Sequence, residues 1–184
     1  MKLTRSFICA VLALGLSSPA LRAQQKPASS PNPVSQAISD TWEGAKRNIK
    51  ESAEQMPDAD YSFKPTDSVR TFGQILAHLA GASYMYCSSA RGEKTPHEED
   101  DFEKTATTKV QIVKVLNDSI AYCDAAYTGL TDRTAAEVVP MAFGGKDAAR
   151  ASALIRNVGH YQEHYGNLVT YFRIKGLVPP SSRR

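Results

Sequence analysis

Four long segments of this chain repeat apolar residues every three or four positions, and this pattern limits the folds it can adopt. The segments cover roughly 33–56, 71–91, 106–128 and 147–175. Such spacing places the apolar side chains on one face of an α-helix, and faces of this kind pack against one another. No alternating pattern typical of strands competes with them. We therefore expect an all-α fold, a four-helix bundle.

Irregular links separate these segments, and one segment begins with a helix-capping pattern. Thr71 has Gln74 three residues after it, which is the pattern of a capping box. The link 92–104 contains an acidic run and is expected to be a solvated crossover between two helices. The stretch 130–146 is the least regular, and we expect a short extended piece there.

Three of the four histidines fall within the helical segments. His160 and His164 are four residues apart, so both rings lie on one helix face with Cβ atoms about 6 Å apart. His78 lies among apolar neighbours in a second segment. A buried imidazole without a partner is costly. A divalent metal held by His78, His160 and His164 would partner all three and leave one coordination position open for chemistry.

Neutral imidazole suits Zn, Ni, Fe or Cu better than Mg or Ca. We expect Zn or Ni first, with Fe or Mn as alternatives. An open coordination position would make the chain a metal-dependent hydrolase or transferase of unknown substrate. Catalytic residues stay unknown, because no general base stands out. A fourth ligand such as Asp40 or Glu43 would close the site and favour a non-enzymatic metal-binding or stress-related dimerisation module. Hydrogen-bonded core histidines without metal are a third explanation.

The stretch His160–His164 also matches H-x-x-E-H, the inverted zinc-peptidase motif, with Glu163 as the general base. That motif needs a further carboxylate ligand downstream. Only 20 residues follow His164, and none of them is Asp or Glu. The peptidase hypothesis therefore lacks its third ligand.

The N-terminus has the pattern of a secretory signal peptide. Basic residues precede the apolar stretch Phe7–Leu16, which is too short to span a bilayer, and Ala23 ends a plausible cleavage site. We expect a periplasmic or secreted protein without stable membrane insertion. The expected organisation is a signal peptide at 1–23, a flexible linker at 24–32, a bundle domain at 33–178 and a C-terminal tail at 179–184.

Cleavage after Ala23 changes the charge balance. The whole chain has a formal net charge of +3, but residues 1–23 hold three of its 22 basic residues and none of its 19 acidic ones. The mature chain then carries 19 basic and 19 acidic residues. No excess positive charge remains to drive nucleic-acid binding by counterion release, so we expect no nucleic-acid partner.

Cleavage would also remove Cys9 and leave Cys87 and Cys123. An even pair of cysteines in an exported protein is compatible with a disulfide, and two separate buried thiols are the alternative. A disulfide needs the two Cα atoms within about 7 Å of each other.

Two stretches resemble signatures of the DinB (DinB/YfiT-like) family. They are VRTFGQILAH at 69–78 and HYQEHYGNLVTYFR at 160–173. The ending KGLVPPSS at 175–182 is similar to the C-terminus of exported members. The resemblance covers nearly all of the mature chain, and the family's metal triad falls on His78, His160 and His164.

The resemblance implies a bundle in which the second and third helices run parallel through a long crossover. Parallel helices would set Cys87 and Cys123 at similar height, which favours the disulfide. It also implies frequent homodimers and a small-molecule substrate that it does not specify. Family relatives include transferases that use low-molecular-weight thiols.

Overall fold

The computed structural model describes residues 30–98, 101–142 and 144–183. The expected signal peptide at 1–23 and residues 24–29 of the expected linker lie outside this part of the chain. The expected bundle domain is described except at residues 99, 100 and 143.

Four long helices dominate the described part and confirm the all-α prediction. They are α1 (Pro33–Gln55), α2 (Phe72–Arg91), α4 (Lys109–Tyr127) and α6 (Arg150–Ile174). Shorter elements fill the links: the 3₁₀ turns η1 (Asp58–Asp60) and η2 (Pro180–Ser182), helices α3 (Phe102–Thr105) and α5 (Asp132–Ala135), and strands β1 (Val138–Val139) and β2 (Ala148–Ala149).

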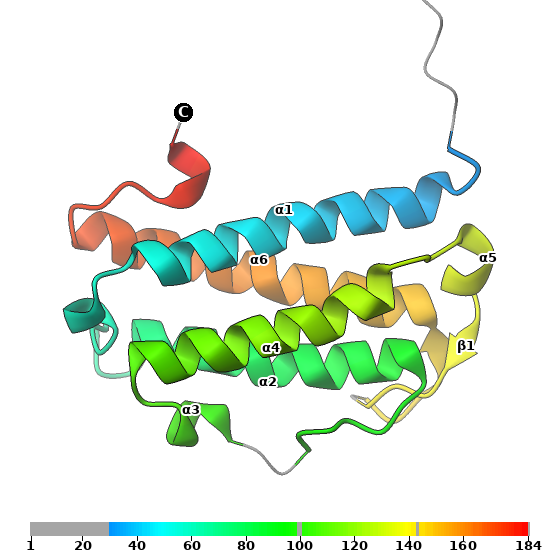
Figure 1. Ribbon diagram of the computed structural model, residues 1–184, viewed down its shortest axis with the longest axis horizontal. Coiled ribbons are helices and arrows are strands. Elements are labelled where there is room, and N and C mark those ends of the chain that lie inside the picture. The colour runs from blue at the N-terminus through cyan, green and yellow to red at the C-terminus, as the bar shows by residue number, and fades with distance from the viewer. Residues whose placement is uncertain (1–29, 99–100, 143, 184) are drawn as a thin grey trace, which may run out of the picture.

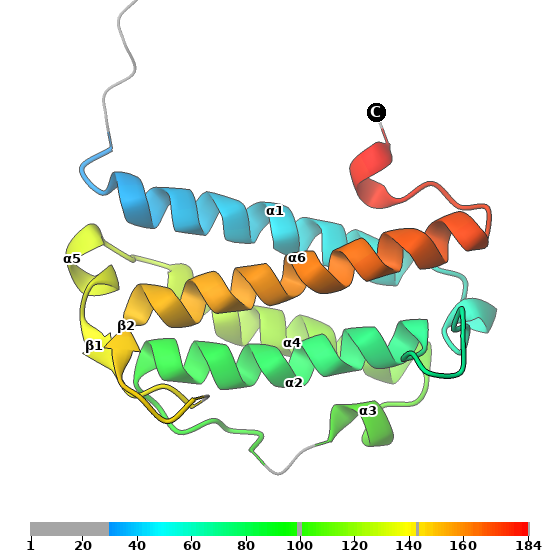
Figure 2. The same ribbon diagram turned by 180° about the vertical axis from the view of Figure 1, so that it is seen from behind.

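The long helices form two parallel pairs. α2 packs against α4 and α6, and α1 packs against α6 and α4. Figures 1 and 2 show that α2 and α4 run in one direction and that α1 and α6 run in the other. The predicted crossover from α2 to α4 is therefore present, and it passes along the end and side of the bundle through α3.

A mainly apolar core fills the space between these helices. Trp42 and Tyr161 are its largest fully buried side chains, and aromatic residues continue it toward the end where α2 begins. There Phe72 meets Phe172 edge to face, with ring centroids 5.7 Å apart. Burial of such side chains supplies the main favourable term for folding.

Helix caps explain where the long helices begin. The Thr71 hydroxyl accepts from the Gln74 amide at 3.2 Å and the Gln74 side chain accepts from the Thr71 amide at 2.9 Å, which confirms the capping box. The start of α1 is capped from a distance. Asp132 of α5 accepts from the Ser35 amide at 2.8 Å, and these bonds lower the pKa of Asp132. Asn32 makes no side-chain cap on α1.

The irregular stretch before α6 contains the predicted extended piece. β1 and β2 pair antiparallel, with Val138 opposite Ala149 and Val139 opposite Ala148. This ladder occupies residues 148–149, and for that reason α6 begins at Arg150 rather than near 147.

Cys87 and Cys123 lie at disulfide-bonding distance, with Cα atoms 5.2 Å apart. Both residues are fully buried, one on α2 and one on α4. Both lie late in their helices, so the parallel arrangement of α2 and α4 brings them to the same height, as the resemblance implied.

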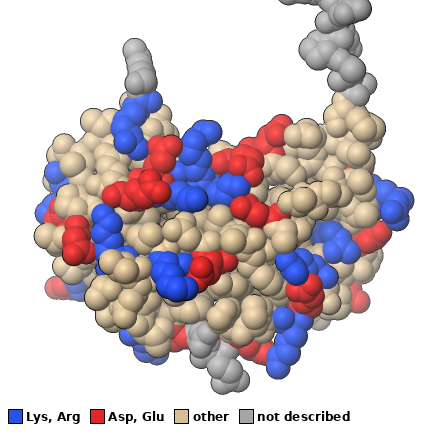
Figure 3. Space-filling model, viewed as in Figure 1, with Lys and Arg blue, Asp and Glu red and all other residues tan. Residues whose placement is uncertain are grey.

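The surface mixes charges of both signs. Figure 3 shows Lys and Arg interspersed with Asp and Glu on the face seen in Figure 1. Pairs such as Lys46–Glu43 at 2.6 Å and Lys114–Asp118 at 2.6 Å are formed along α1 and α4. Among the helices that the structure describes, none is long and apolar enough to cross a membrane.

Candidate metal centre

The packing of α2 on α6 brings three histidines together. His78 lies in the middle of α2, and His160 and His164 lie one turn apart on α6. Ring centroids are 5.0 Å apart for His78 and His160, 5.0 Å for His78 and His164, and 4.5 Å for His160 and His164. One ring nitrogen from each residue lies within 4.8 Å of the others. The three rings thus form a compact triangle that we call the histidine triad.

One pair of ring nitrogens has the spacing expected around a small divalent metal. Nε2 of His78 lies 3.1 Å from Nε2 of His160. Two nitrogens bound to one tetrahedral zinc at about 2.0–2.1 Å would lie roughly 3.3 Å apart. The spacing of His78 and His160 is close to this value, and the nitrogens of all three residues lie within 4.8 Å of one another, so side-chain shifts would close the triad around an ion.

The environment of the triad keeps its imidazoles neutral. Burial lowers the pKa of His164 to about 4, with further lowering by His160 and His78. Burial also lowers the pKa of His160, with His78 adding to it, and lowers the pKa of His78, with Arg70 adding to it. A neutral imidazole is the form that binds a metal, so the donor set suits a transition metal.

This electrostatic arrangement predicts a pH dependence for the metal-free protein. The unfolded chain protonates His164 at the ordinary pKa of 6.5, whereas the folded chain does so near 4. Between these values the unfolded state binds more protons, so the free energy of unfolding falls as the pH is lowered through the window. We expect a loss of about 2 kcal/mol at His164. Urea titrations from pH 6.5 to pH 4 measure it.

The His164→Gln variant is the control for this titration, because it keeps a polar side chain that does not titrate. Its stability should change less than the wild type's between pH 6.5 and pH 5, where few carboxyl groups titrate. Equal slopes in the two proteins would contradict the placement of His164 in a buried triad.

Two of the three rings have a polar side chain close to Nδ1. Nδ1 of His78 lies 3.0 Å from Oε1 of Glu103, which belongs to the short helix α3. The guanidinium of Arg70 binds the same carboxylate at two points, with Nε donating to Oε2 at 2.8 Å and Nη2 donating to Oε1 at 3.2 Å. Nδ1 of His164 lies 3.5 Å from the side-chain nitrogen of Asn167.

A cavity of about 760 Å³ lies beside His164. Its walls come from the loop before α2, from α2 itself, from α3 and from α6, and its polar lining includes Arg70, Gln74, Glu103, Asn167 and Thr170. A smaller cavity of about 390 Å³ lies beside His78, under the crossover. Glu103 lines both cavities. The triad is therefore reached from a space that can accommodate a small polar molecule.

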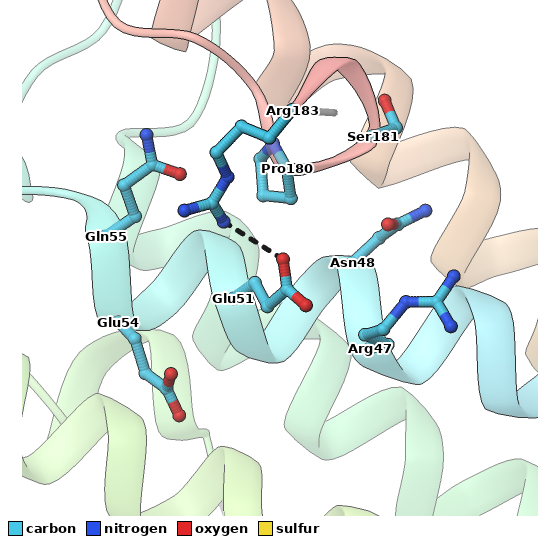
Figure 4. A pocket seen from close by; sticks show the side chains of 8 residues that line it. All are labelled: Arg47, Asn48, Glu51, Glu54, Gln55, Pro180, Ser181 and Arg183. Atoms are coloured by element: carbon cyan, nitrogen blue, oxygen red, sulfur yellow. Dashed lines mark hydrogen bonds and ion pairs between the residues drawn. The ribbon is translucent and has the colours of Figure 1, made fainter.

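A cavity of similar size, about 790 Å³, lies between α1 and the C-terminal turn η2. Figure 4 shows its charged lining, in which Arg183 pairs with Glu51 at 2.9 Å. It shares no lining residue with the cavity beside His164. We therefore place the candidate site at the triad, where the possible ligands lie.

Other residues named from the sequence lie away from the triad. Asp40 and Glu43 are both exposed on α1, where Asp40 accepts from Gln36 and Glu43 pairs with Lys46. Glu163 is exposed on α6. Among the described residues, the triad gathers no fourth Asp, Glu, His or Cys ligand.

Glu103 is the residue of the site that sequence analysis missed. The link 92–104 was expected to be solvated, whereas residues 102–105 form a helix that places Glu103 against His78. The one signal available was Phe102, an aromatic residue directly after the acidic run. Its ring packs near Tyr84, with centroids 6.1 Å apart, and holds α3 against the bundle.

Solved structures of similar fold carry the same architecture. A DinB-like protein from Bacillus cereus is 15% identical with a TM-score of 0.62, and the match covers 79% of this chain and 95% of that one. A DinB-like protein from Bacillus subtilis is 18% identical with a TM-score of 0.62, covering 80% and 99%. A mycothiol-dependent maleylpyruvate isomerase is 13% identical with a TM-score of 0.59, covering 73% and 60%. Identities this low show a common fold.

None of the curated proteins matches this sequence. The family model of the DinB superfamily matches residues 41–168, a range that includes all three histidines of the triad. The match spans more than half of the sequence, and the chain belongs to the DinB superfamily.

Proposed function

We propose that the histidine triad holds a divalent transition metal and that the protein is a metal-dependent hydrolase or transferase. The observation that carries the proposal is the convergence of three neutral imidazoles beside a cavity. Zn or Ni is the proposed metal, because all the donors are imidazoles, and Fe or Mn are the alternatives. The chemistry that such an ion supplies when bound is polarisation of a substrate or activation of a water molecule.

The chain's own residues would perform the remaining tasks. His78, His160 and His164 provide three ligands, and the cavity beside His164 provides room for the substrate. Polar groups such as Gln74, Asn167 and Thr170 line that room and can orient a small polar molecule by hydrogen bonds. The proposed substrate is therefore a small polar compound rather than a polymer.

A thiol co-substrate is one form of this proposal. A structural neighbour of this fold is described as a mycothiol-dependent maleylpyruvate isomerase, and the dependence of that protein on a thiol is what suggests a thiol co-substrate here. Hydrolysis needs only water as the second reactant. Assays of the metal-loaded protein with and without such thiols distinguish the two reactions.

The location proposed for the protein rests on the pattern of its N-terminus, and the proposed assembly rests on the family resemblance. We propose export with cleavage near Ala23, and a homodimer as the assembly. Sequencing the N-terminus of the protein from a periplasmic fraction tests the first, and light scattering of the mature chain tests the second.

Metal content tests the central proposal. The mature protein, prepared without a histidine tag and loaded in turn with Zn, Ni, Fe and Mn, should retain about one ion per chain after dialysis. His160→Ala removes one of the three ligands, so we expect it to lose the ion under the same conditions. Elemental analysis measures both.

His97 provides a matched control, because it is a histidine outside the triad and packs against Tyr84 at 4.3 Å between centroids. His97→Ala removes no ligand of the triad, so it should retain far more metal than His160→Ala, although His97 also packs near Phe102 of α3. Absence of stoichiometric metal from the wild type after every loading would contradict the proposed function.

A further inference from the structure

The crossover between α2 and α4 reaches the candidate metal centre through one side chain, Glu103. We propose that Glu103 is a positioning residue of this centre: it accepts a hydrogen bond from Nδ1 of His78 and so leaves Nε2 of His78 as the ligand nitrogen. This inference rests on the proposed metal site and assigns a role in it to a residue outside the histidine triad.

The carboxylate of Glu103 is held in one orientation. Arg70 binds both of its oxygens, with Nε on Oε2 at 2.8 Å and Nη2 on Oε1 at 3.2 Å. Such a two-point pair fixes both the position and the plane of a carboxylate. Arg70 is itself held at its backbone, because the hydroxyl of Tyr171 on α6 donates to the Arg70 carbonyl.

A carboxylate held by a guanidinium acts as an acceptor, so its partner on His78 must be the donor. Nδ1 of His78 lies 3.0 Å from Oε1 of Glu103, which is a normal hydrogen-bond distance. A neutral imidazole with its proton on Nδ1 has a free lone pair on Nε2. Nε2 of His78 is the atom that faces Nε2 of His160, at 3.1 Å.

The two contacts of His78 therefore divide between its two nitrogens. Nδ1 donates to Glu103, and Nε2 faces the triad, where in the metal-free protein its lone pair accepts from Nε2–H of His160 at 3.1 Å. A metal-binding histidine commonly donates its second N–H to a carboxylate, which fixes the tautomer and raises the basicity of the ligand. The arrangement of Glu103, His78 and Arg70 has this form.

The crossover is anchored so that Glu103 stays in place. Phe102, its neighbour in α3, lies 5.4 Å from His97 and 6.1 Å from Tyr84 between ring centroids. Asp101 accepts backbone hydrogen bonds from Lys104 and Thr105 at 3.0 Å each, closing the turn of α3. The short helix thus presents Glu103 to His78 from a defined position.

Two variants of Glu103 separate its hydrogen bond from its charge. Glu103→Ala removes the acceptor, and we expect it to weaken zinc binding about 10- to 100-fold. Glu103→Gln keeps an oxygen that can accept from Nδ1, so its loss of affinity should be several-fold smaller. Competition with a chromophoric zinc chelator measures both affinities. Asp101→Asn is the matched control, because Asp101 is a carboxylate of the same crossover whose side chain pairs with Lys104 at 2.7 Å.

The tautomer of His78 gives a second readout that needs no metal. In the metal-free wild type, ¹⁵N NMR of the histidine rings should show the His78 proton on Nδ1, and in Glu103→Ala it should show the proton moved toward Nε2. Wild-type zinc affinity in Glu103→Ala would overturn the inference, as would an equal loss in Asp101→Asn or an unchanged tautomer in Glu103→Ala. A wild type that binds no zinc would instead contradict the proposed function, and the tautomer would then decide the role of Glu103 alone.

Discussion

Replacing Trp42 by alanine is expected to lower the free energy of unfolding by about 4 kcal/mol, because it empties the centre of the core. Trp42 is fully buried. Its ring stacks on Tyr127 with centroids 4.9 Å apart and meets Tyr161 edge to face at the same distance. Its Nε1 donates to Asp124 at 2.8 Å. Urea unfolding followed by far-UV circular dichroism measures the loss.

Trp42→Phe is the matched control for this change. It keeps an aromatic ring between Tyr127 and Tyr161 and removes only the indole N–H with part of the volume, so we expect a loss of about 1–2 kcal/mol. A Trp42→Ala protein within 1 kcal/mol of the wild type would contradict the central place given to Trp42. Tyr161 directly follows His160 on α6, so loosening this contact should also weaken metal binding.

Removing the disulfide expected between α2 and α4 is the second large change. Cys87 and Cys123 enclose a loop with a sequence separation of 36. By the chain-entropy model, a closed loop of this length stabilises the folded state by about 4 kcal/mol, because it restricts the unfolded chain. We expect the double variant Cys87→Ala, Cys123→Ala to lose about 2–4 kcal/mol in urea unfolding.

The wild type in a strong reductant is the control, since it lacks the bond but keeps both sulfur atoms in the core. It should lose nearly as much stability as the double variant. The exported, oxidised wild type should show no free thiol when it is denatured without reductant. Free thiols in that sample, or equal stability of oxidised and reduced protein, would contradict the disulfide.

The elements of the fold could be predicted because their signals are local. The apolar period of 3.6 residues located the long helices, and Thr71 with Gln74 located the start of α2. The triad could also be predicted, because the spacing of His160 and His164 puts them on one helix face and His78 lies on another helix with apolar neighbours. These inferences need only the geometry of one helix at a time.

Contacts made between distant segments could not be predicted in the same way. Asp132 caps α1 from 97 residues away, and nothing in the sequence near Asn32 indicates it. Glu103 contacts His78 from the crossover, because Phe102 packs near Tyr84 and holds α3 against the bundle. Both contacts depend on the packing of helices that are far apart in the chain, which periodicity does not describe.

Asn157 shows the same limit on one helix. It lies three residues before His160 on α6, a spacing that puts both residues on nearly the same helix face. The structure places it against α4 instead, fully buried, with Nδ2 donating to the hydroxyl of Tyr127 at 3.1 Å. Asn157 contacts the end of α4 and His160 contacts His78 of α2, so residues one turn apart on α6 face different helices.

The most direct test of the metal centre is anomalous X-ray diffraction from crystals of the mature protein loaded with zinc, recorded on both sides of the zinc absorption edge. We predict one strong peak per chain between α2 and α6, within bonding distance of a ring nitrogen of each of His78, His160 and His164, with Nε2 as the ligand atom of His78. Zinc bound elsewhere, or no peak at the histidine triad in fully loaded crystals, would contradict the account.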